Sequence, residues 1–287
     1  MKRLWLLLAV LCAATGAVAG AALLSGGALP LLFPAGPVAL AERHVILLTF
    51  ALSGLVVLPV FGALFFFAWR YRAEGPAARQ AHAPNWDHDS PLAEFSWWLV
   101  PSLIILALAV LAWQSAHQLD PYTPLPGGAP LTVDVVALDW KWLFLYPAQG
   151  VASVNRLVIP AGVPVTFELT ADAPMNSFWI PALGGQIMVM PGMLTQLNLE
   201  ASRAGSYPGF SANISGEGFS GMAFEAEALP PADFAAWAAS ASSSVPLDYP
   251  ALAAPSENVA PATYAGLPPG LLDSIMMSYM APASTTP

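Results

Sequence analysis

The sequence predicts a membrane-anchored α + β chain, with two transmembrane helices followed by a Greek-key β-sandwich and a C-terminal extension. Three observations predict this fold class. Hydrophobic residues make up 56% of the 287 residues and charged residues only 9%, which is not the balance of a soluble protein. Three long uncharged runs occur before residue 120, and two of them lie after residue 40. After residue 130 the runs become short and alternating, and Gly, Pro and Asn separate them, which is typical of β-strands.

The N-terminal segment, residues 1–27, has two interpretations. Lys2 and Arg3 precede an uncharged apolar stretch at residues 4–24, which is the order found in export signals. The same stretch is also long enough to remain as an additional N-terminal helix. The sequence leaves both interpretations open.

Residues 28–120 are predicted to form a two-helix transmembrane hairpin. The first span covers residues 45–69, which carry no charge and are long enough to cross a hydrocarbon core of roughly 30 Å. The second span covers residues 97–113, where tryptophans at both ends bracket an apolar run, as aromatic belts do at membrane interfaces. The lipid bilayer is therefore an expected partner of this part of the chain.

The orientation of the hairpin follows from its arginines. Arg70, Arg72 and Arg79 lie in the short connection between the two spans, and the positive-inside rule places such a connection in the cytoplasm. Everything after His117 is then expected outside the cytoplasm. In a bacterium this is the periplasmic side of the inner membrane.

Residues 130–229 are predicted to form the β-sandwich, because alternating apolar runs recur there at a spacing typical of Greek-key sandwiches. Residues 230–287 are rich in Ala, Pro and Ser and are predicted to be an extension that packs on the sandwich or on a partner. Short helices are expected in this extension at residues 234–239 and 271–280. The expected strands of the sandwich cover residues 131–138, 153–159, 163–169, 194–199 and 222–228.

The net charge of −9 belongs to the second part of the chain. Residues 1–130 carry six Lys or Arg and six Asp or Glu, whereas residues 131–287 carry three and twelve. An acidic domain repels phosphates, so nucleic acid is disfavoured as a partner, whereas a basic protein would be attracted.

Soft metal ligands are confined to the first part of the chain. Cys12 is the only cysteine, and the four histidines are His44, His82, His88 and His117. A metal site after residue 117 would therefore lack both thiolate and imidazole ligands, which are the groups that copper prefers.

Two segments of the predicted sandwich contain the most informative motifs. They are Met175-Asn176-Ser177-Phe178-Trp179-Ile180-Pro181 and the loop from Ser211 to Met222, which reads Ser-Ala-Asn-Ile-Ser-Gly-Glu-Gly-Phe-Ser-Gly-Met. Both resemble the copper-binding segments of subunit II of the haem–copper oxidases. In that family a His-Ser-Phe-Trp strand end and a Cys-x-x-x-Cys-x-x-x-His-x-x-Met loop hold a two-copper centre. The resemblance implies a cupredoxin-like fold for the sandwich.

The resemblance also implies that this copper site is vestigial. Hydroxyl, amide and phenyl groups do not replace the thiolates and imidazoles that a mixed-valence copper pair requires. The matching positions are therefore expected not to bind metal, and the chain is expected to bind no cofactor of its own. Six positions of this sequence are expected to be vestigial: Asn176, Ser211, Asn213, Ser215, Phe219 and Met222. Of these, only Met222 has the same residue type as the family's ligand.

Further segments resemble one branch of this family, the cytochrome bo-type ubiquinol oxidase subunit II. They are residues 139–147, 175–178, 218–222 and 252–257. The resemblance implies a subunit of a proton-translocating quinol oxidase complex, in which this chain is a non-redox scaffold and outer cap. Its implied partners are subunit I, which would hold the haems and one copper, and smaller membrane subunits.

Glu94, just before the second span, is the candidate for a direct functional role. In bo-type enzymes the matching glutamate lies near the mouth of a proton pathway into subunit I, so the resemblance implies a role in proton uptake. The alternative is a solvated acid at a helix start, which attraction to the helix dipole favours by roughly 0.3 to 1 kcal/mol.

The lipidated cysteine of the family has no counterpart at its usual position. Leu24-Ser25-Gly26 is followed by Gly27, so lipidation there is chemically excluded. Cys12 follows a leucine instead of a small residue and is interpreted as an apolar filler.

Aromatic and methionine side chains in the sandwich have plain structural interpretations. Trp140 and Trp142 are expected to lie on a strand and to fill a core or an interface. Met188, Met190 and Met193 are expected to pack, because no histidine is present to complete a copper site with them.

Two alternatives to a quinol oxidase subunit are open at this point. One is a cytochrome c oxidase subunit II that has lost its copper centre, since the acidic domain would suit a basic cytochrome. The other is a stand-alone, membrane-anchored binding or assembly protein without a catalytic partner.

Overall fold

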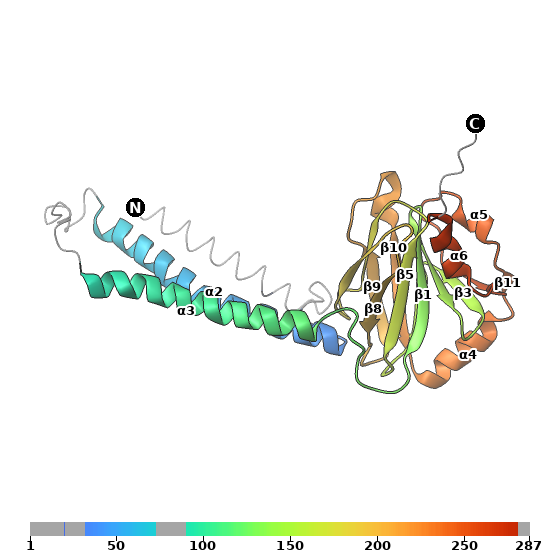
Figure 1. Cartoon of the computed structure of the whole chain (residues 1–287), viewed down its shortest axis with the longest axis horizontal. Helices are drawn as coiled ribbons and strands as arrows, with labels where there is room; N and C mark the ends of the chain where they lie inside the picture. The colour runs from blue at the N-terminus through green and yellow to red at the C-terminus, as the bar shows by residue number, and fades with distance from the viewer. Residues whose placement is uncertain (1–19, 21–31, 73–89, 281–287) are drawn as a thin grey trace. The chain divides into compact units, whose positions relative to one another are not determined.

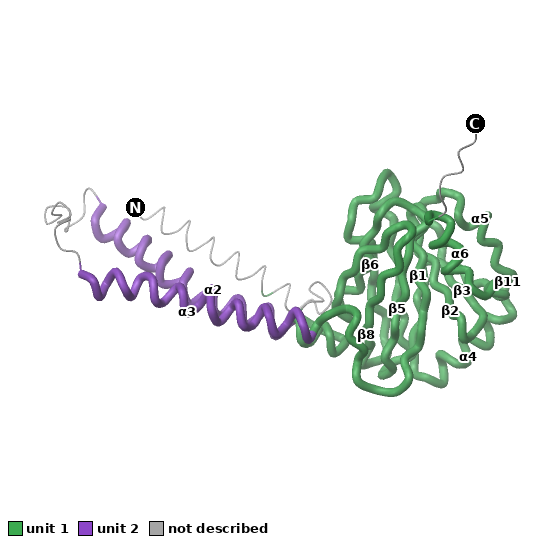
Figure 2. Tube along the Cα trace, in the orientation of Figure 1, with its two compact units in different colours: residues 1–42, 119–287 green, residues 43–118 purple. Residues whose placement is uncertain are grey.

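The computed structural model describes residue 20 and residues 32–72 and 90–280 (Figure 1). Apart from Gly20, the predicted N-terminal segment 1–27 lies outside the described residues, and so does the position that replaces the lipidated cysteine. The chain divides into two compact units, Met1–Glu42 with Leu119–Pro287 and Arg43–Gln118 (Figure 2).

Two long apolar helices account for most of the second unit. Helix α2 spans Pro37–Arg70 and α3 spans Pro91–Gln118, with mean hydropathies of 2.4 and 2.2 over their most apolar windows. No side chain in either of these windows is buried inside the protein, as expected where lipid is the solvent. The two membrane helices expected from the sequence are confirmed as candidates. Both helices extend beyond the predicted spans of residues 45–69 and 97–113, because helical structure continues into the polar flanks.

The remainder of the described chain forms a β-sandwich of two mixed sheets, which confirms the predicted fold class. The first sheet has the strand order β11-β12-β3-β2-β1-β5-β8, and the second has the order β4-β10-β9-β6-β7. In the first sheet the strands before the extension are β1 (Leu131–Leu138), β2 (Lys141–Tyr146), β3 (Val151–Val154), β5 (Val165–Ala171) and β8 (Thr195–Leu199). The second sheet contains β4 (Arg156–Pro160), β6 (Asn176–Trp179), β7 (Gln186–Val189), β9 (Gly205–Ser211) and β10 (Ala223–Leu229).

An aromatic cluster fills the space between the two sheets. Phe178 on β6 lies at its centre, with ring centroids 5.4 Å from Trp142, 5.4 Å from Phe167 and 5.2 Å from Phe224. All four side chains are buried. Aromatic pairs at these separations add attraction beyond the burial of their area, so this cluster is the main contact between the sheets.

The C-terminal extension completes the first sheet and creates a second core on its outer face. It contains α4 (Pro231–Ala241), β11 (Val245–Pro246), α5 (Tyr249–Ala253), β12 (Ala262–Ala265) and α6 (Leu271–Ser278). Leu272 and Ile275 of α6 pack against Val136, Leu138 and other outward-facing residues of the sheet. Figure 1 shows the extension, in orange to red, beside β1 and β3. The extension therefore belongs to the same compact unit as the sandwich.

A seam of hydrogen bonds joins the start of α2 to the sandwich. The amide of Ala35 donates to the carbonyl of Ala182 over 2.7 Å, and the amide of Ser202 donates to the carbonyl of Ala35 over 2.8 Å. The amide of Ala39 donates to the carbonyl of Leu183 over 3.1 Å. The carboxylate of Glu42 accepts from the amide of Gly185 over 2.9 Å. We call residues 35–42, with these partners, the anchor seam.

Two details of the predicted strands are wrong. Residues 153–159 are not one strand, because Asn155 has φ 53° and the chain passes there from β3 in the first sheet to β4 in the second. The Asn155 side chain fixes this corner by accepting from the amide of Trp142 and donating to the carbonyl of Val259, each over 2.8 Å. Trp140 is not on a strand either, since it lies in the β1–β2 turn with φ 59°.

Candidate functional site

The first motif and the polar loop meet where β6 pairs with β9. We use the name polar loop for residues 211–222, which connect β9 to β10. Phe178 is opposite Ser211 in the register, and this places the Ser211 hydroxyl 3.0 Å from Asn176 Oδ1 and 3.2 Å from the carbonyl oxygen of Asn213. The amide of Ser211 donates to the carbonyl of Met222 over 3.1 Å. The loop is therefore closed at its base and bonded to the end of β6.

Amide side chains complete this network with neutral partners. Asn176 Nδ2 donates to the carbonyl of Pro174 and Asn213 Nδ2 donates to the carbonyl of Met175, each over 2.8 Å. Asn176 and Ser211 are buried. Neutral hydrogen bonds between buried partners fix geometry at a modest net free energy each, about 1 kcal/mol. Hydrogen bonds between protein groups thus hold the loop at the place where the resembling family has copper.

The other positions that were predicted to be vestigial lie farther along the same loop. Ser215 Oγ is buried and has no hydrogen-bond partner among the described residues. Phe219 is half-buried in a short 3₁₀-helix, Glu217–Gly221. The thioether of Met222 belongs to the core between the sheets, where only 1% of its surface is exposed. The structure thus brings Asn176, Ser211 and Asn213 together and gives Met222 a packing role.

The donor set of the loop does not fit a metal ion. Sequence positions after 117 contain neither histidine nor cysteine. Within residues 32–72 and 90–280, no group of three His, Cys, Asp or Glu side chains is placed to hold a metal. Amide, hydroxyl and buried thioether groups do not form the thiolate and imidazole environment that a copper pair needs. We therefore assign no chemical step of this chain to a metal at the loop.

Trp140 covers the polar loop from the β1–β2 turn. A Cβ atom at Gly218 would lie 2.5 Å from the Trp140 indole and 2.8 Å from the side chain of Glu257. Only glycine therefore fits between the indole and the extension at this position. Trp142, two residues later, lies in the core between the sheets as expected. The extension and Trp140 together hold the loop in place from two sides.

A buried lysine, whose role was not predicted, ties the extension to the sandwich. The Lys141 side chain is 1% exposed, and its Nζ donates to the carbonyl of Ala254 over 2.7 Å and to the hydroxyl of Ser256 over 2.5 Å. Burial lowers the pKa of this ammonium, and the carboxylate of Asp139 acts in the opposite direction. The partners are more than 110 residues away in sequence, so no local pattern indicates the contact.

The prediction that the methionines pack is wrong for two of them. Met188 and Met193 are 38% and 50% exposed. Strand β7 is the last strand of its sheet, and its side chains alternate so that Val189 is buried and Met188 points outward. Met175, just before β6, and Ile214, within the polar loop, are also exposed.

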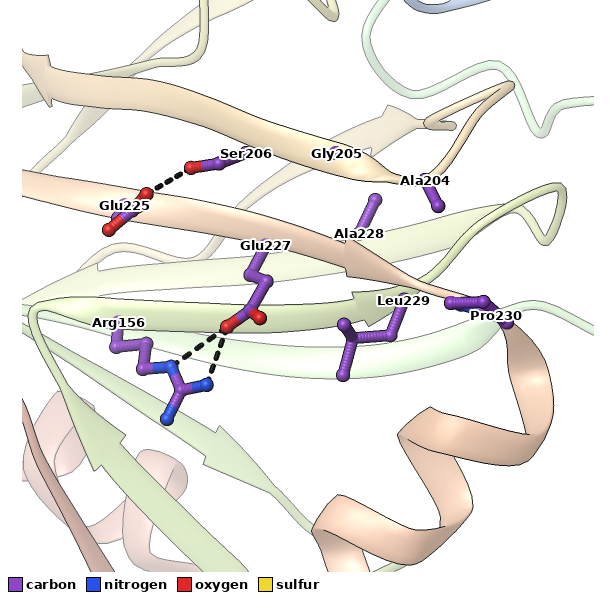
Figure 3. A pocket seen from close by; sticks show the side chains of 9 residues that line it. All are labelled: Arg156, Ala204, Gly205, Ser206, Glu225, Glu227, Ala228, Leu229 and Pro230. Carbon is purple, nitrogen blue, oxygen red and sulfur yellow. Dashed lines mark hydrogen bonds and ion pairs between the residues drawn. The ribbon is translucent and has the colours of Figure 1, made fainter.

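A pocket lies at the opposite end of β9 and β10 from the polar loop (Figure 3). Arg156 forms an ion pair with Glu227 in this pocket, because Arg156 Nε and Nη2 donate to Glu227 Oε2 over 3.0 and 2.5 Å. The carboxylate of Glu225 accepts from the hydroxyl of Ser206. The arginine, which is the cation of the pocket, is thus already occupied, and we assign the pocket no function.

Glu94 lies in the first turn of α3 and is exposed within this chain. Its amide donates to the carbonyl of Ser90 over 3.0 Å, and the Ser90 hydroxyl accepts from the amide of Ala93 over 3.4 Å. These are contacts of a helix N-terminus, which an acidic side chain favours. The side chain itself remains available to solvent or to a partner.

Comparison with known proteins gives matches to both parts of the first unit. Residues 131–229 match the family described as cytochrome c oxidase subunit II, periplasmic domain, and residues 246–283 match the COX aromatic rich motif. A cytochrome bo(3) ubiquinol oxidase subunit 2 of Pseudomonas putida is 49% identical over 77% of this chain and 69% of its own length. A ubiquinol oxidase subunit 2 of Acetobacter aceti is 48% identical over 77% and 72%. A quinol oxidase subunit 2 of Bacillus cereus is 40% identical over 73% and 72%.

Proposed function

The chain belongs to the ubiquinol oxidase subunit 2 family, and on this basis we propose that it is subunit II of a complex that oxidises quinol and reduces O2 to water. The observation that carries the proposal is the hydrogen-bonded polar loop. Because Ser211 and Asn176 bond to each other where the copper-binding relatives of the fold have ligands, electrons have no metal centre to enter at this loop. A membrane-soluble reductant removes the need for such a centre.

Within the complex the chain acts as a scaffold and an outer cap, and it binds no cofactor. Subunit I is the partner that supplies the haems and the single copper at which O2 is reduced, and smaller membrane subunits complete the assembly. The exposed side chains of α2 and α3 are available for lipid and for the helices of these partners. The catalytic chemistry then belongs to the complex and not to this chain alone.

The anchor seam supports a multi-pass arrangement in a bacterial inner membrane. Residues 35–42 are hydrogen-bonded to the sandwich, so the start of α2 is on the same side of the membrane as the sandwich. The sandwich also follows the end of α3 directly. The connection between the helices then lies on the opposite side, and Arg70 and Arg72 at its start favour the cytoplasm. The sandwich is consequently periplasmic.

Purification of the complex through a C-terminal tag tests the proposal. We expect a large hydrophobic companion, haem absorbance, copper in the companion only, and oxygen consumption with quinol but not with reduced cytochrome c. Turnover with cytochrome c alone would identify instead a copper-deficient cytochrome c oxidase. Absence of both haem and a companion would identify a stand-alone anchored protein.

For Glu94 we propose proton uptake on the cytoplasmic side. Its carboxylate is exposed at the start of α3 and is available to collect protons for a pathway in subunit I. In Glu94→Gln the amide cannot exchange a proton, so we expect quinol-driven turnover to fall on the order of tenfold, with a changed pH profile. The measurement is oxygen consumption by the purified complex between about pH 6 and about pH 9.

Asp120→Asn provides the matched control for this variant. Asp120 is an exposed acid just beyond the other end of α3, where its carboxylate accepts from the amide of Tyr122 over 2.9 Å. It should leave turnover unchanged. Equal rates for Glu94→Gln and the unmodified complex across the whole pH range would show that Glu94 serves only the helix N-terminus.

A further inference from the structure

A buried carboxylate lies on the sheet face against which helix α6 packs. In β1, residues 133, 135 and 137 face the core between the sheets, whereas Val136 and Leu138 face the second core under the extension. Asp134 shares this outward face, and only 9% of its surface is exposed. No hydrogen bond to its carboxylate occurs among the described residues. A buried carboxylate without a donor is costly to keep ionised.

The neighbours of Asp134 add negative charge and no positive charge. Glu168 of β5 is directly opposite Asp134 in the parallel register, and Asp273 of α6 acts on it electrostatically from the extension. On the other side β2 contributes Leu145, and β8, beyond β5, carries no charged residue. Lys141, which is on this face, donates hydrogen bonds to the carbonyl of Ala254 and the hydroxyl of Ser256 instead.

Helix α6 is held to the sheet by few contacts. It spans only Leu271–Ser278, and a helix of this length is not stable alone in water. Leu272 and Ile275 are its buried side chains. Just after it, the Tyr279 hydroxyl donates to Asp172 Oδ1 over 2.6 Å. The helix therefore depends on these contacts with the sandwich to stay in place.

We propose that α6 is a pH-sensitive latch, which docks on β1 and β5 when Asp134 is protonated and loosens when Asp134, Glu168 and Asp273 are all ionised. The geometry carries this inference, because Asp134 and Glu168 are register partners on the sheet face against which α6 packs, and α6 itself carries Asp273. The latch is a property of the chain itself and goes beyond the proposed oxidase role.

The direction of the pH dependence follows from the environment of Asp134. Burial, followed by the charges of Glu168 and Asp273, raises the pKa of Asp134 from 3.8 to about 7. A raised pKa means that the docked state binds the proton more tightly than the undocked state. Docking is therefore strongest below about pH 4 and weakens as the pH rises towards about 7. If the sandwich is periplasmic, as proposed above, acidification of that side by outward proton movement closes the latch.

Hydrogen exchange of the full-length chain in detergent tests the latch. Exchange of peptides covering residues 267–280 is measured at about pH 5.5 and about pH 8, with labelling times scaled for intrinsic exchange. We expect α6 to exchange about tenfold faster at the higher pH, which is the effect of about one pKa unit of difference between the docked and undocked states. In Asp134→Asn, the neutral amide should keep α6 protected at both pH values.

Two further variants keep the test decisive. Asp273→Asn removes one repelling charge and should reduce the difference in α6 exchange between the two pH values while leaving the fold intact, because Asp273 is exposed. Asp233→Asn, an exposed acid in the first turn of α4, should behave like the unmodified chain. Equal exchange of α6 at both pH values, or the same pH dependence in Asp134→Asn, would overturn the latch. Neither result depends on quinol oxidation.

Discussion

Phe178→Ala is expected to lower the free energy of unfolding of the sandwich by about 3–5 kcal/mol. Phe178 has no exposed surface, and its ring stacks on Phe224 with an interplanar angle of 7°. The same ring contacts Trp142 and Phe167 from the first sheet. Truncation to alanine therefore opens a cavity between the two sheets and removes the contact that joins them.

Denaturant unfolding followed by tryptophan fluorescence measures this loss. Phe210→Ala is the control, because Phe210 is only half-buried. Its ring centroid lies 5.2 Å from that of Trp179 on the neighbouring strand. This variant should lower the free energy of unfolding by about 1 kcal/mol. Equal losses for the two variants would show that the aromatic cluster is not the main contact between the sheets.

Gly36→Ala is expected to open the anchor seam and to reduce stability by about 3 kcal/mol. A Cβ atom at Gly36 would lie 2.2 Å from the carbonyl oxygen of Glu200 and 3.3 Å from that of Leu183. Both obstacles are backbone atoms, which cannot rotate away as a side chain can. The chain must move, and the hydrogen bonds of Ala35 and Ala39 lengthen or break.

Amide hydrogen exchange at Ala39 and Gly185 detects an open seam, because both amides donate hydrogen bonds across it. Gly128→Ala is the matched control, since a Cβ atom there would meet no atom within 4 Å. It should leave the exchange of both amides unchanged. Full protection of both amides in Gly36→Ala would contradict the close approach at this glycine.

Local sequence patterns were sufficient to predict those elements whose side chains all face the same kind of environment, either lipid or protein core. The two helices follow from uncharged runs, and the predicted strand at residues 131–138 coincides with β1, whose side chains are buried almost throughout. Strand β9 escaped prediction because it contains Pro208, which is unusual inside a sheet. In the structure β6 pairs only with Phe210 and Ser211 of β9, so the position of Pro208 is free on that side.

The candidate site, like the fold, could be predicted only in part. The vestigial positions could be named from a motif, because the polar loop keeps its spacing when its ligands change. The contacts that shape the surroundings could not be named, since they join residues far apart in sequence, as Lys141 and Ala254 do. The corner at Asn155 had a local signal, because asparagine tolerates a left-handed conformation, but the signal was hidden in an apolar run.

The extension has a consequence for biosynthesis. Strand β12, which pairs with β3, follows the strands of the sandwich in the sequence. Until β12 has been synthesised, β3 is an unprotected sheet edge, and until residues 254–256 have been synthesised, Lys141 lacks the partners that its buried ammonium requires. A prematurely terminated chain consequently exposes both defects to proteases and chaperones. The sandwich thus protects this edge and this ammonium only once the extension has docked on it.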